Sequence, residues 1–145
     1  MELLHVTIKD FLGIKNASLD FEGRGLFSIQ GVNGAGKTSI LEAVYYALFE
    51  KSLRFSGNSK SELVNVYSQD GVAVIEAVFR KNDRTIITIK RFIGKNSRYM
   101  RYDYENGTSL EFTKNEEIRS EIEHLGFFPQ NFRYSVILPQ GGASR

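Results

Sequence analysis

The sequence of 145 residues contains no cysteine. This absence excludes a disulfide framework, a zinc–thiolate site and thiol catalysis within the chain, and it fits a reducing compartment. Long apolar runs are also lacking, because runs such as residues 43–49 fall far short of the about 20 residues that a membrane-spanning helix needs. The N-terminus carries Glu2, Lys9 and Asp10 and so lacks the basic, then apolar, order of a signal peptide. We therefore expect a cytoplasmic protein without a membrane partner.

Neither sign of charge is in large excess, because 19 Lys and Arg residues face 17 Asp and Glu residues and leave a net charge of +2. Hydrophobic residues make up 41% and charged residues 25% of the chain, which are the proportions of a soluble globular domain. A chain of this length buries roughly 68 to 70% of its unfolded surface, enough for one core or for two small lobes that share one. Length therefore does not require a second domain.

Alternating apolar residues near the N-terminus predict strands that lead to a helix. Residues 3–8 place Leu4, Val6 and Ile8 on one face, and residues 17–21 repeat the alternation. Residues 26–30 read as a third strand that runs into a glycine-rich loop. After this loop, apolar residues recur on one face at helical spacing. They are Ile40, Leu41, Val44, Ala47 and Leu48, followed by Phe49.

The middle of the chain predicts an antiparallel β layer over about residues 72–112. Residues 72–80 and 85–92 are alternating, β-branched runs joined by a short polar turn, and they form one expected hairpin. Residues 98–104 and 109–112 form a second expected hairpin, in which Asn106-Gly107 supplies the positive φ angles of a tight turn.

A second helix is expected after this layer. Thr113 and Glu116 have the spacing of a capping box, in which each side chain satisfies the other's free backbone N–H group. Gly126 fits the left-handed residue that ends a helix. The apolar stripe between them consists of Ile118, Ile122 and Leu125. A last short strand is expected at residues 134–138.

The glycine-rich loop at residues 31–38 carries the clearest chemical signal. It matches the phosphate-binding pattern G-x-x-x-x-G-K-S/T, in which bare backbone N–H groups wrap the phosphates of a nucleotide at a helix N-terminus. The lysine of this pattern bridges the β- and γ-phosphates, and the hydroxyl that follows binds magnesium. A chance match is the alternative, but the expected flanking strand and helix disfavour it. The residues expected to contact the nucleotide are Asn33, Gly34, Ala35, Gly36, Lys37, Thr38 and Ser39.

The stretch from residue 3 to residue 49 resembles the N-terminal ATPase lobe of SbcC-type DNA-repair proteins, the SMC-like ABC ATPases that act with an SbcD-type nuclease on DNA ends. The residues that carry the resemblance are Val6, Ile8, Phe11, Gly13-Ile14-Lys15-Asn16, Phe21, residues 31–39 and Leu41-Glu42-Ala43. The resemblance implies an α/β fold: the N-terminal lobe of an ABC-type P-loop NTPase head over residues 1–140, with an antiparallel β layer. Residues 141–145 would be the truncated start of a coiled coil or a cloning-derived tail.

Residues 137–141 resemble the Q-loop of this family, which would lie at residues 138–141. The resemblance implies that Gln140 acts in catalysis together with Lys37 and reaches the magnesium ion and the attacking water. Thr38 and Gln140 would then be the residues that contact Mg²⁺, and the cofactors would be ATP and Mg²⁺. The long, strand-rich interval between Lys37 and Gln140 favours this family over ABC transporter subunits.

The sequence contains no Walker B run ending in Asp-Glu, no LSGG-like signature and no switch histidine. In the SbcC-like family these parts lie in a C-terminal lobe, separated by a long coiled coil. The resemblance therefore implies that the chain alone is inactive as an ATPase. The partners that it implies are the C-terminal lobe of the same protein, a second ATPase head in an ATP-dependent homodimer, an SbcD-type nuclease and double-stranded DNA.

Two further segments are expected near the nucleotide because of the same resemblance. Leu12, Gly13 and Lys15 follow the first strand, where relatives contact the nucleotide. The segment that corresponds to Val64, Asn65 and Val66 lies near the base. Plain core packing is the alternative for the apolar members of both segments.

Basic residues gather between positions 80 and 101, where eight Lys and Arg residues accompany a single Asp83. They are Arg80, Lys81, Arg84, Lys90, Arg91, Lys95, Arg98 and Arg101. This distribution predicts a local basic surface, and such surfaces bind nucleic acid through phosphates in a salt-sensitive way. We expect Lys95, Arg98 and Arg101 to contact the DNA backbone; the alternative is a solvated hairpin.

Three other functions remain open from the sequence. One is another SMC-like ATPase, for chromosome organisation or recombination, and another is a self-sufficient phosphotransferase that turns over without a second lobe. A purely DNA-binding module is disfavoured by the complete phosphate loop. The expected location is the cytoplasm, with the nucleoid, in a prokaryote and the nucleus in a eukaryote.

Overall fold

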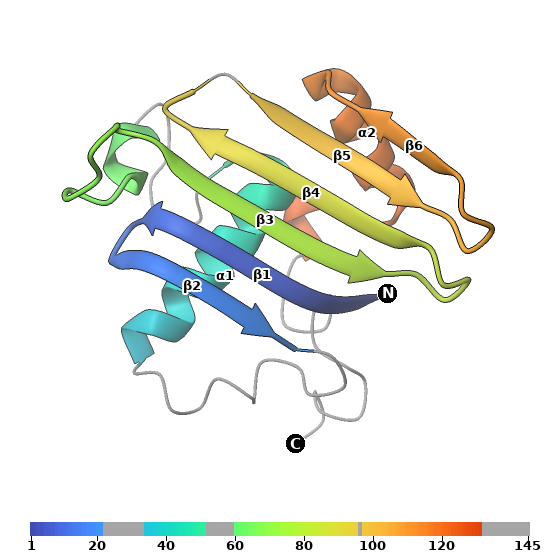
Figure 1. The fold of residues 1–145 in the computed structure, drawn as a ribbon, viewed down its shortest axis with the longest axis horizontal. Helices are drawn as coiled ribbons and strands as arrows, with labels where there is room; N and C mark the ends of the chain where they lie inside the picture. The colour runs from blue at the N-terminus through green and yellow to red at the C-terminus, as the bar shows by residue number, and fades with distance from the viewer. Residues whose placement is uncertain (22–33, 52–59, 96, 132–145) are drawn as a thin grey trace.

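The computed structural model describes residues 1–21, 34–51, 60–95 and 97–131, and in this part of the chain one six-stranded sheet forms the framework (Figure 1). Every neighbouring pair of strands is antiparallel, and the strand order is β2-β1-β3-β4-β5-β6. The strands are β1 (Glu2–Phe11), β2 (Ile14–Asp20), β3 (Ala73–Arg80), β4 (Ile86–Ile93), β5 (Arg98–Asp103) and β6 (Ser109–Phe112). The expected antiparallel layer is therefore confirmed, and the two N-terminal strands extend it.

Both α-helices lie on the same side of the sheet, behind it in Figure 1. Helix α1 (Gly34–Phe49) contacts β1, β3 and β4, and helix α2 (Asn115–His124) contacts β5 and α1. Two short 3₁₀ helices, η2 (Lys60–Leu63) and η3 (Pro129–Asn131), complete the described elements. Within the described ranges, no helix combines the length and apolar character that a bilayer span requires. The expected strands at residues 26–30 and 134–138 lie outside the described residues.

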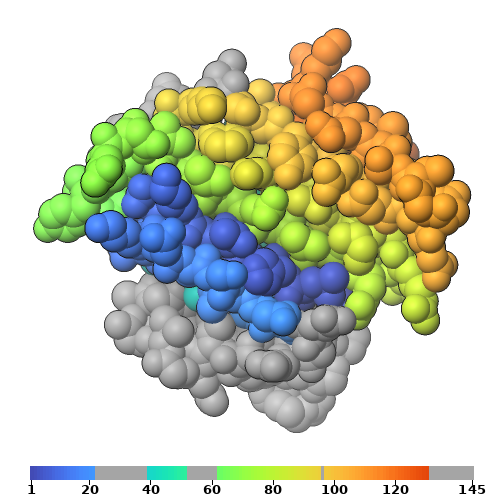
Figure 2. Space-filling model, viewed as in Figure 1, coloured from blue at the N-terminus to red at the C-terminus, as the bar shows by residue number. Residues whose placement is uncertain are grey.

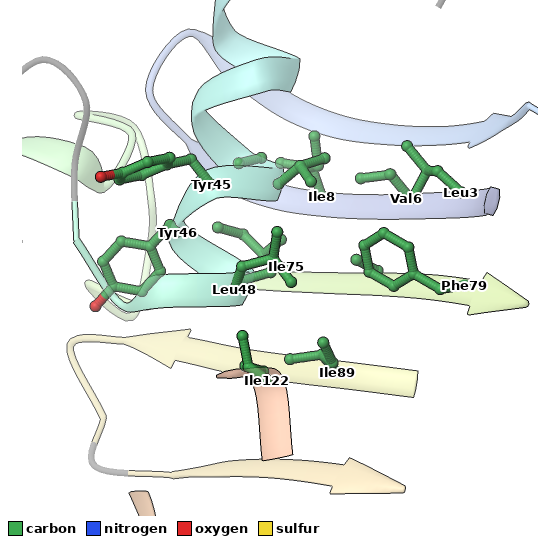
Figure 3. Packing of buried hydrophobic residues seen from close by; sticks show 14 of the residues in the cluster. Leu3, Val6, Ile8, Tyr45, Tyr46, Leu48, Ile75, Phe79, Ile89 and Ile122 are labelled. Atoms are coloured by element: carbon green, nitrogen blue, oxygen red, sulfur yellow. The ribbon is translucent and has the colours of Figure 1, made fainter. Parts of the chain in front are cut away.

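The core lies between the sheet and the helices. Along β3, Ala73, Ile75, Ala77 and Phe79 are buried while the residues between them are half-buried, so the period-2 pattern points one row of side chains at α1. Figure 3 shows this packing, with Ile8 of β1, Ile75 and Phe79 of β3 and Ile89 of β4 facing the helices.

Helix α1 is buried on nearly all sides rather than along the single stripe that the sequence indicated. Buried residues continue from Ser39 to Leu48, with Leu41 alone half-buried. A helix that is buried on nearly all sides is typical of a central position in a fold. The residues that follow the phosphate-binding pattern are therefore held by the core itself.

The turn between β5 and β6 differs from the prediction that Asn106 and Gly107 both have positive φ angles. Gly107 has a φ of 93°, but Asn106 does not share the positive φ angle. The N–H of Gly107 donates to the oxygen of Tyr104 at 3.0 Å, and the N–H of Tyr104 donates to Thr108 at 2.9 Å. The Asn106 Oδ1 atom accepts from the N–H and the hydroxyl of Thr108, which holds Asn106 outside the left-handed region. The connection is thus a longer turn that ends in a single left-handed glycine.

The expected capping box at the start of α2 is wrong. Lys114 is the N-cap residue, and no side-chain hydrogen bond caps the helix there. The helix begins at Asn115, whose Oδ1 atom instead accepts from Nη1 of Arg91 at 3.2 Å. A tertiary contact thus fixes the start of α2, in place of the local bonds of a Thr113–Glu116 box.

The end of α2 confirms the prediction for Gly126, which has a φ of 93°. The N–H of Gly126 donates to Glu123 at 2.9 Å and the N–H of Phe127 donates to Ile122 at 3.2 Å, the bond pair of a Schellman motif. The Phe127 ring then packs on Phe79 of β3, with the ring centroids 5.4 Å apart. The helix end is thereby attached to the sheet.

Candidate nucleotide site

Helix α1 begins inside the phosphate-binding pattern, at Gly34. Gly31, Val32 and Asn33 lie outside the described residues, whereas residues 34–39 form the first turns of the helix. The first turn contains no acidic residue. Because the first four N–H groups of a helix have no partner within the helix, this end attracts anions, and no carboxylate of its first turn opposes a phosphate there. The helix start therefore suits an anionic group such as a phosphate.

The turn between β1 and β2 carries the second expected group of nucleotide contacts. Asp10 and Leu12 have φ angles of 54° and 51°, the left-handed region that residues other than glycine rarely occupy. Such conformations cost free energy and persist where surrounding contacts hold them. In Figure 1 this turn lies at the same end of the sheet as the beginning of α1.

Segment 63–65 provides the contacts that hold this turn. The N–H of Leu12 donates to Leu63 at 2.7 Å, and the N–H of Asn65 donates to Asp10 at 2.7 Å. The Asn65 side-chain amide donates to the oxygen of Leu12 at 2.8 Å. Phe11 and Val64 form an isolated β-bridge beside these bonds. The structure therefore brings together two of the groups that the sequence expected at the nucleotide.

The residues of the β1–β2 turn and of segment 64–66 differ in how far they are exposed to solvent. Leu12 and Val64 are half-buried and pack against the core, as the alternative interpretation expected. Gly13 and Lys15 are exposed, and the Val66 side chain is 87% exposed. Gly13, Lys15 and Val66 are thus accessible to a ligand, whereas Leu12 and Val64 support the turn.

A cavity of about 280 Å³ lies beside this turn. Its basic wall consists of Lys9 and Lys15, and Asp10 and Asp70 supply carboxylates. The Asp70 carboxylate accepts from the N–H of Val72 and from the Ser68 hydroxyl, and these hydrogen bonds hold its pKa below the usual value. Sequence reasoning identified Lys15 of this group but not its neighbours.

The remaining residue expected in catalysis, Gln140, lies outside the described residues, as does Asn33. Lys37 and Thr38 lie within α1. The phosphate contact expected of Lys37 and the Mg²⁺ contact expected of Thr38 therefore depend on where α1 begins.

The basic residues between positions 80 and 101 do not form one continuous basic surface. Arg91 is only 2% exposed and lies in the core, so the expectation of a surface position is wrong for this residue. Most of the others are paired with carboxylates. The pairs are Arg80–Glu2, Lys81–Asp83, Arg84–Glu105, Arg98–Glu50 and Arg101–Asp103. These pairs reduce the local excess of positive charge.

The three residues expected to contact DNA lie in different surroundings. Arg98 is largely buried and donates from Nε to Glu50 at 3.2 Å. Arg101 donates to Asp103 at 3.1 Å, and this carboxylate raises the pKa of Arg101. Lys95 is exposed, and its Nζ atom lies 5.2 Å from the centre of the Phe92 ring, with Nζ of Lys90 at 5.5 Å from the same ring. Figure 2 shows in front the face of the sheet that lies away from α1 and α2.

Arg91 is the residue of greatest structural importance that sequence reasoning missed. Its Nε atom donates to the Ala47 oxygen at 2.9 Å and its Nη2 atom to the Leu48 oxygen at 3.4 Å, so the guanidinium caps the C-terminus of α1. Burial lowers the pKa of Arg91, and the Glu50 carboxylate opposes this shift. Position 91 follows the buried positions Ile87 and Ile89 at a spacing of two, and this alternation was the available signal.

Comparison with known proteins agrees with this arrangement. The family described as "AAA domain" matches residues 5–143. Along the whole chain, the sequence is 29% identical to the "Probable DNA double-strand break repair Rad50 ATPase" of Aquifex aeolicus, of which it spans 15%. It is 28% identical to the SbcC component of the SbcCD nuclease of Bacillus subtilis, over 86% of the chain and 12% of that relative.

A shorter match covers about a third of the chain. The "DNA replication and repair protein RecF" of Desulfitobacterium hafniense is 44% identical over 54 residues, which is 37% of the chain and 14% of that relative. The chain thus spans less than a fifth of each of these relatives. Because the AAA domain match covers nearly every residue, the chain belongs to this family, and the predicted similarity to SbcC-type ATPases is confirmed.

Proposed function

We propose that residues 1–140 form the ATP-binding, N-terminal lobe of an ABC-type ATPase head in a DNA-repair ATPase of the SbcC type. The observation that carries this proposal is the start of α1 at Gly34, inside the phosphate-binding pattern and without an acidic residue in its first turn. The similarity to Rad50 and SbcC along most of the chain supports the choice among P-loop proteins.

Each part of the pattern has a distinct role in this proposal. The backbone N–H groups of residues 33–36 surround the phosphates, and the Lys37 ammonium group donates to the β- and γ-phosphate oxygens. The Thr38 hydroxyl is a ligand of Mg²⁺, which neutralises phosphate charge when it is bound. Gln140 orients the attacking water and contacts the metal. Gly13, Lys15 and Val66, which are exposed, contact the nucleotide on the side of the β1–β2 turn.

The groups required for hydrolysis are divided between two lobes in this proposal. A C-terminal lobe of the same protein supplies Walker B, and the signature motif of a second head closes on the nucleotide. ATP favours the closed dimer because it binds that form more tightly than the open form. Opening after hydrolysis then controls the access of an SbcD-type nuclease to double-strand breaks. Such a protein acts on DNA in the nucleoid or, in a eukaryote, in the nucleus.

Lys37→Ala tests the nucleotide site directly. We expect the affinity for Mg-ATP, measured by titration calorimetry, to fall at least about tenfold, because a charge-assisted contact to phosphate is lost. The fold should persist, and Lys81→Ala, which removes a lysine paired with Asp83 far from the pattern, is the matched control. Undiminished ATP affinity in Lys37→Ala would contradict the site.

Hydrolysis separates the two-lobe proposal from a self-sufficient phosphotransferase. We expect steady-state ATP hydrolysis only after this chain is mixed with the polypeptide that carries Walker B and the signature motif. Turnover by the single chain that disappears in Lys37→Ala would favour the phosphotransferase instead.

The second candidate function is that of another SMC-like ATPase, for chromosome organisation or recombination. The 44% identity to a DNA replication and repair protein RecF over 54 residues favours this class. Nuclease assays on DNA ends distinguish the two candidates, since an SbcC-type head changes the activity of an SbcD-type nuclease when ATP is added. An unchanged nuclease would favour the second candidate.

A further inference from the structure

The end of α1 that lies away from the phosphate-binding pattern is joined to α2 by a polar bridge. We propose that Arg91 and Asn115 form a link through which ATP, bound at the start of α1, stabilises the first turns of α2. The inference rests on the proposed nucleotide site. Arg91 and Asn115 are positioning residues in this scheme, because neither belongs to the expected nucleotide contacts.

On the α1 side, the link consists of backbone contacts. The Arg91 guanidinium donates to the carbonyl oxygens of Ala47 and Leu48 in the last turn of the helix. It also lies 3.8 Å from the Glu50 carboxylate, just beyond the helix. Because Arg91 belongs to β4 and is only 2% exposed, its guanidinium cannot move away into solvent. The position of the α1 C-terminus and the position of this guanidinium therefore depend on each other.

On the α2 side, the link ends at the first helical residue. Nη1 of Arg91 donates to Oδ1 of Asn115 at 3.2 Å. The N-cap residue Lys114 makes no side-chain capping bond, so this end of α2 lacks the local contact that commonly stabilises a helix start. The bond from Arg91 thus restrains the start of α2 together with the burial of Ile118.

Apolar packing accompanies the link, because Leu48 of α1 and Ile118 and Ile122 of α2 belong to the same buried core cluster. A cavity of about 580 Å³ lies between the end of α1 and α2. Leu48 and Phe49 line it from α1, and Arg119, Ile122 and Glu123 line it from α2. The cavity interrupts the packing between the two helices, and beside it Arg91 supplies the polar contact that joins the end of α1 to the start of α2.

The geometry of α1 explains how a nucleotide reaches this link. A helix of 16 residues is about 24 Å long and its internal hydrogen bonds make it stiff. A phosphate bound at its first N–H groups restrains its start, and the restrained helix holds its last carbonyl groups more firmly on Arg91. Local opening of α2 then becomes rarer while the fold stays the same.

Hydrogen exchange of the α2 amides in this chain, with and without Mg-ATP, tests the link. In the wild type, we expect saturating Mg-ATP to slow exchange at residues 118–122 by about fivefold or more, the lower range of coupling between two sites. In Asn115→Ala the slowing should fall below about twofold, although the affinity for ATP stays within about twofold of the wild type. Affinity changes little because α2 is closed most of the time in either state.

Two variants separate the link from a merely structural effect. Asn115→Asp keeps an oxygen that accepts from Arg91 and should retain the slowing of the wild type. Ser120→Ala changes an exposed residue of the same helix and should also retain it. Exchange of buried amides in β3 and β4 reports whether each variant is folded.

Each remaining outcome is decisive. Slowing in Asn115→Ala equal to that of the wild type, loss of slowing in Asn115→Asp, or a wild type that binds ATP without slowing would overturn the link and leave the nucleotide site intact. A wild type that binds no ATP would overturn the proposed function and the link with it.

Discussion

Several charged and polar side chains at the end of α1 depend on one another. Glu50 follows the helix with a φ of 56°, and its N–H donates to Tyr46 at 2.7 Å. Its carboxylate accepts from Arg98 and lies beside Arg91. A strained backbone at a residue other than glycine needs such support, and the two guanidinium groups supply it. Together with burial, the negative charge of the Glu50 carboxylate in turn raises the pKa of the nearby Tyr46 phenol.

Tyr46 gives this group a measurable pH dependence. Burial, with a further contribution from the Glu50 carboxylate, raises the pKa of Tyr46 to about 12. An unfolded chain releases the phenol proton near pH 10, so between pH 10 and about 12 the unfolded state binds fewer protons than the folded state. Stability is therefore lost as the pH rises through this window.

We expect urea denaturation to detect this loss when the wild type is compared with Tyr46→Phe. Between pH 9 and pH 11 the free energy of unfolding of the wild type should fall by about 1 kcal/mol more than that of Tyr46→Phe. Tyr67→Phe, which changes a ring that is 77% exposed, is the control and should behave as the wild type does. Parallel pH profiles for the wild type and Tyr46→Phe would refute this account.

At the scale of elements, left-handed glycines set where strands and helices stop. Gly126 ends α2, and Gly94 follows β4 with nearly the same φ, 92° against 93°. They differ in surroundings: a Cβ atom at Gly126 would meet no other atom within 4 Å, whereas a Cβ atom at Gly94 would collide with the carbonyl oxygen of Gly71. A glycine-to-alanine substitution at Gly126 therefore tests only the cost of the left-handed backbone. At Gly94 it also tests the close contact with the Gly71 carbonyl oxygen.

Gly126→Ala should lower the free energy of unfolding by about 1–2 kcal/mol, the cost of a left-handed residue with a Cβ atom. Gly94→Ala should lower it by a further 1–3 kcal/mol or so, because the collision forces β4 away from the segment around Gly71. Gly13→Ala, with open space around its Cβ position, is the control and should change stability by about 0.5 kcal/mol or less. Equal losses in Gly126→Ala and Gly94→Ala would rule out the close approach as a separate cause.

Elements with a regular period could be predicted from the sequence, whereas their tertiary supports could not. The β3–β4 and β5–β6 hairpins follow from alternating residues, and the end of α2 follows from Gly126. The start of α2 could not be predicted from Thr113 and Glu116, because a residue distant in sequence, Arg91, fixes it. A local pattern carries no information about such a partner.

The candidate site also has one part that could be predicted from the sequence and one part that could not. The phosphate-binding pattern predicts the start of α1 because glycines and a lysine at fixed spacing serve one chemical purpose. The hydrogen bonds of Asn65 to the β1–β2 turn join segments far apart in the chain, and nothing in either segment alone indicates them. The family resemblance, rather than periodicity, brought both segments into the expected site.

For the whole molecule, the distribution of charge decides which basic residues remain for DNA. The face of the sheet opposite the helices contains internal polar pairs, such as the Tyr99 hydroxyl with Glu76 at 3.3 Å and Arg101 with Asp103. Lys95 is exposed beside the Phe92 ring and has no carboxylate partner among the residues that the structure describes. We therefore rank Lys95 first and Arg98 last among the three proposed DNA contacts.

Single alanine variants of the assembled ATPase check this ranking by duplex-DNA binding across a salt series. Lys95→Ala should reduce the slope of log affinity against log salt by about 0.9, the value for one phosphate contact, without loss of stability. Arg98→Ala should instead lower stability by about 1–3 kcal/mol, because Glu50 loses its closest guanidinium partner. Lys81→Ala is the control. An unchanged salt slope in Lys95→Ala and in Arg101→Ala would exclude DNA contact on this face.

The strand order also determines when the nucleotide site can form during folding. Strands β3 to β6 are consecutive neighbours, so their pairing closes only short loops and is fast. Strand β1 pairs with β3 across a long stretch of chain that includes α1, as in the pairing of Ile8 with Ile75, and closing this loop has a larger entropic cost. The meander from β3 to β6 thus provides the template on which β1 docks late. Because α1 packs across β1, β3 and β4, its docking is complete only when β1 has joined the meander, so the proposed nucleotide site forms at a late step of folding.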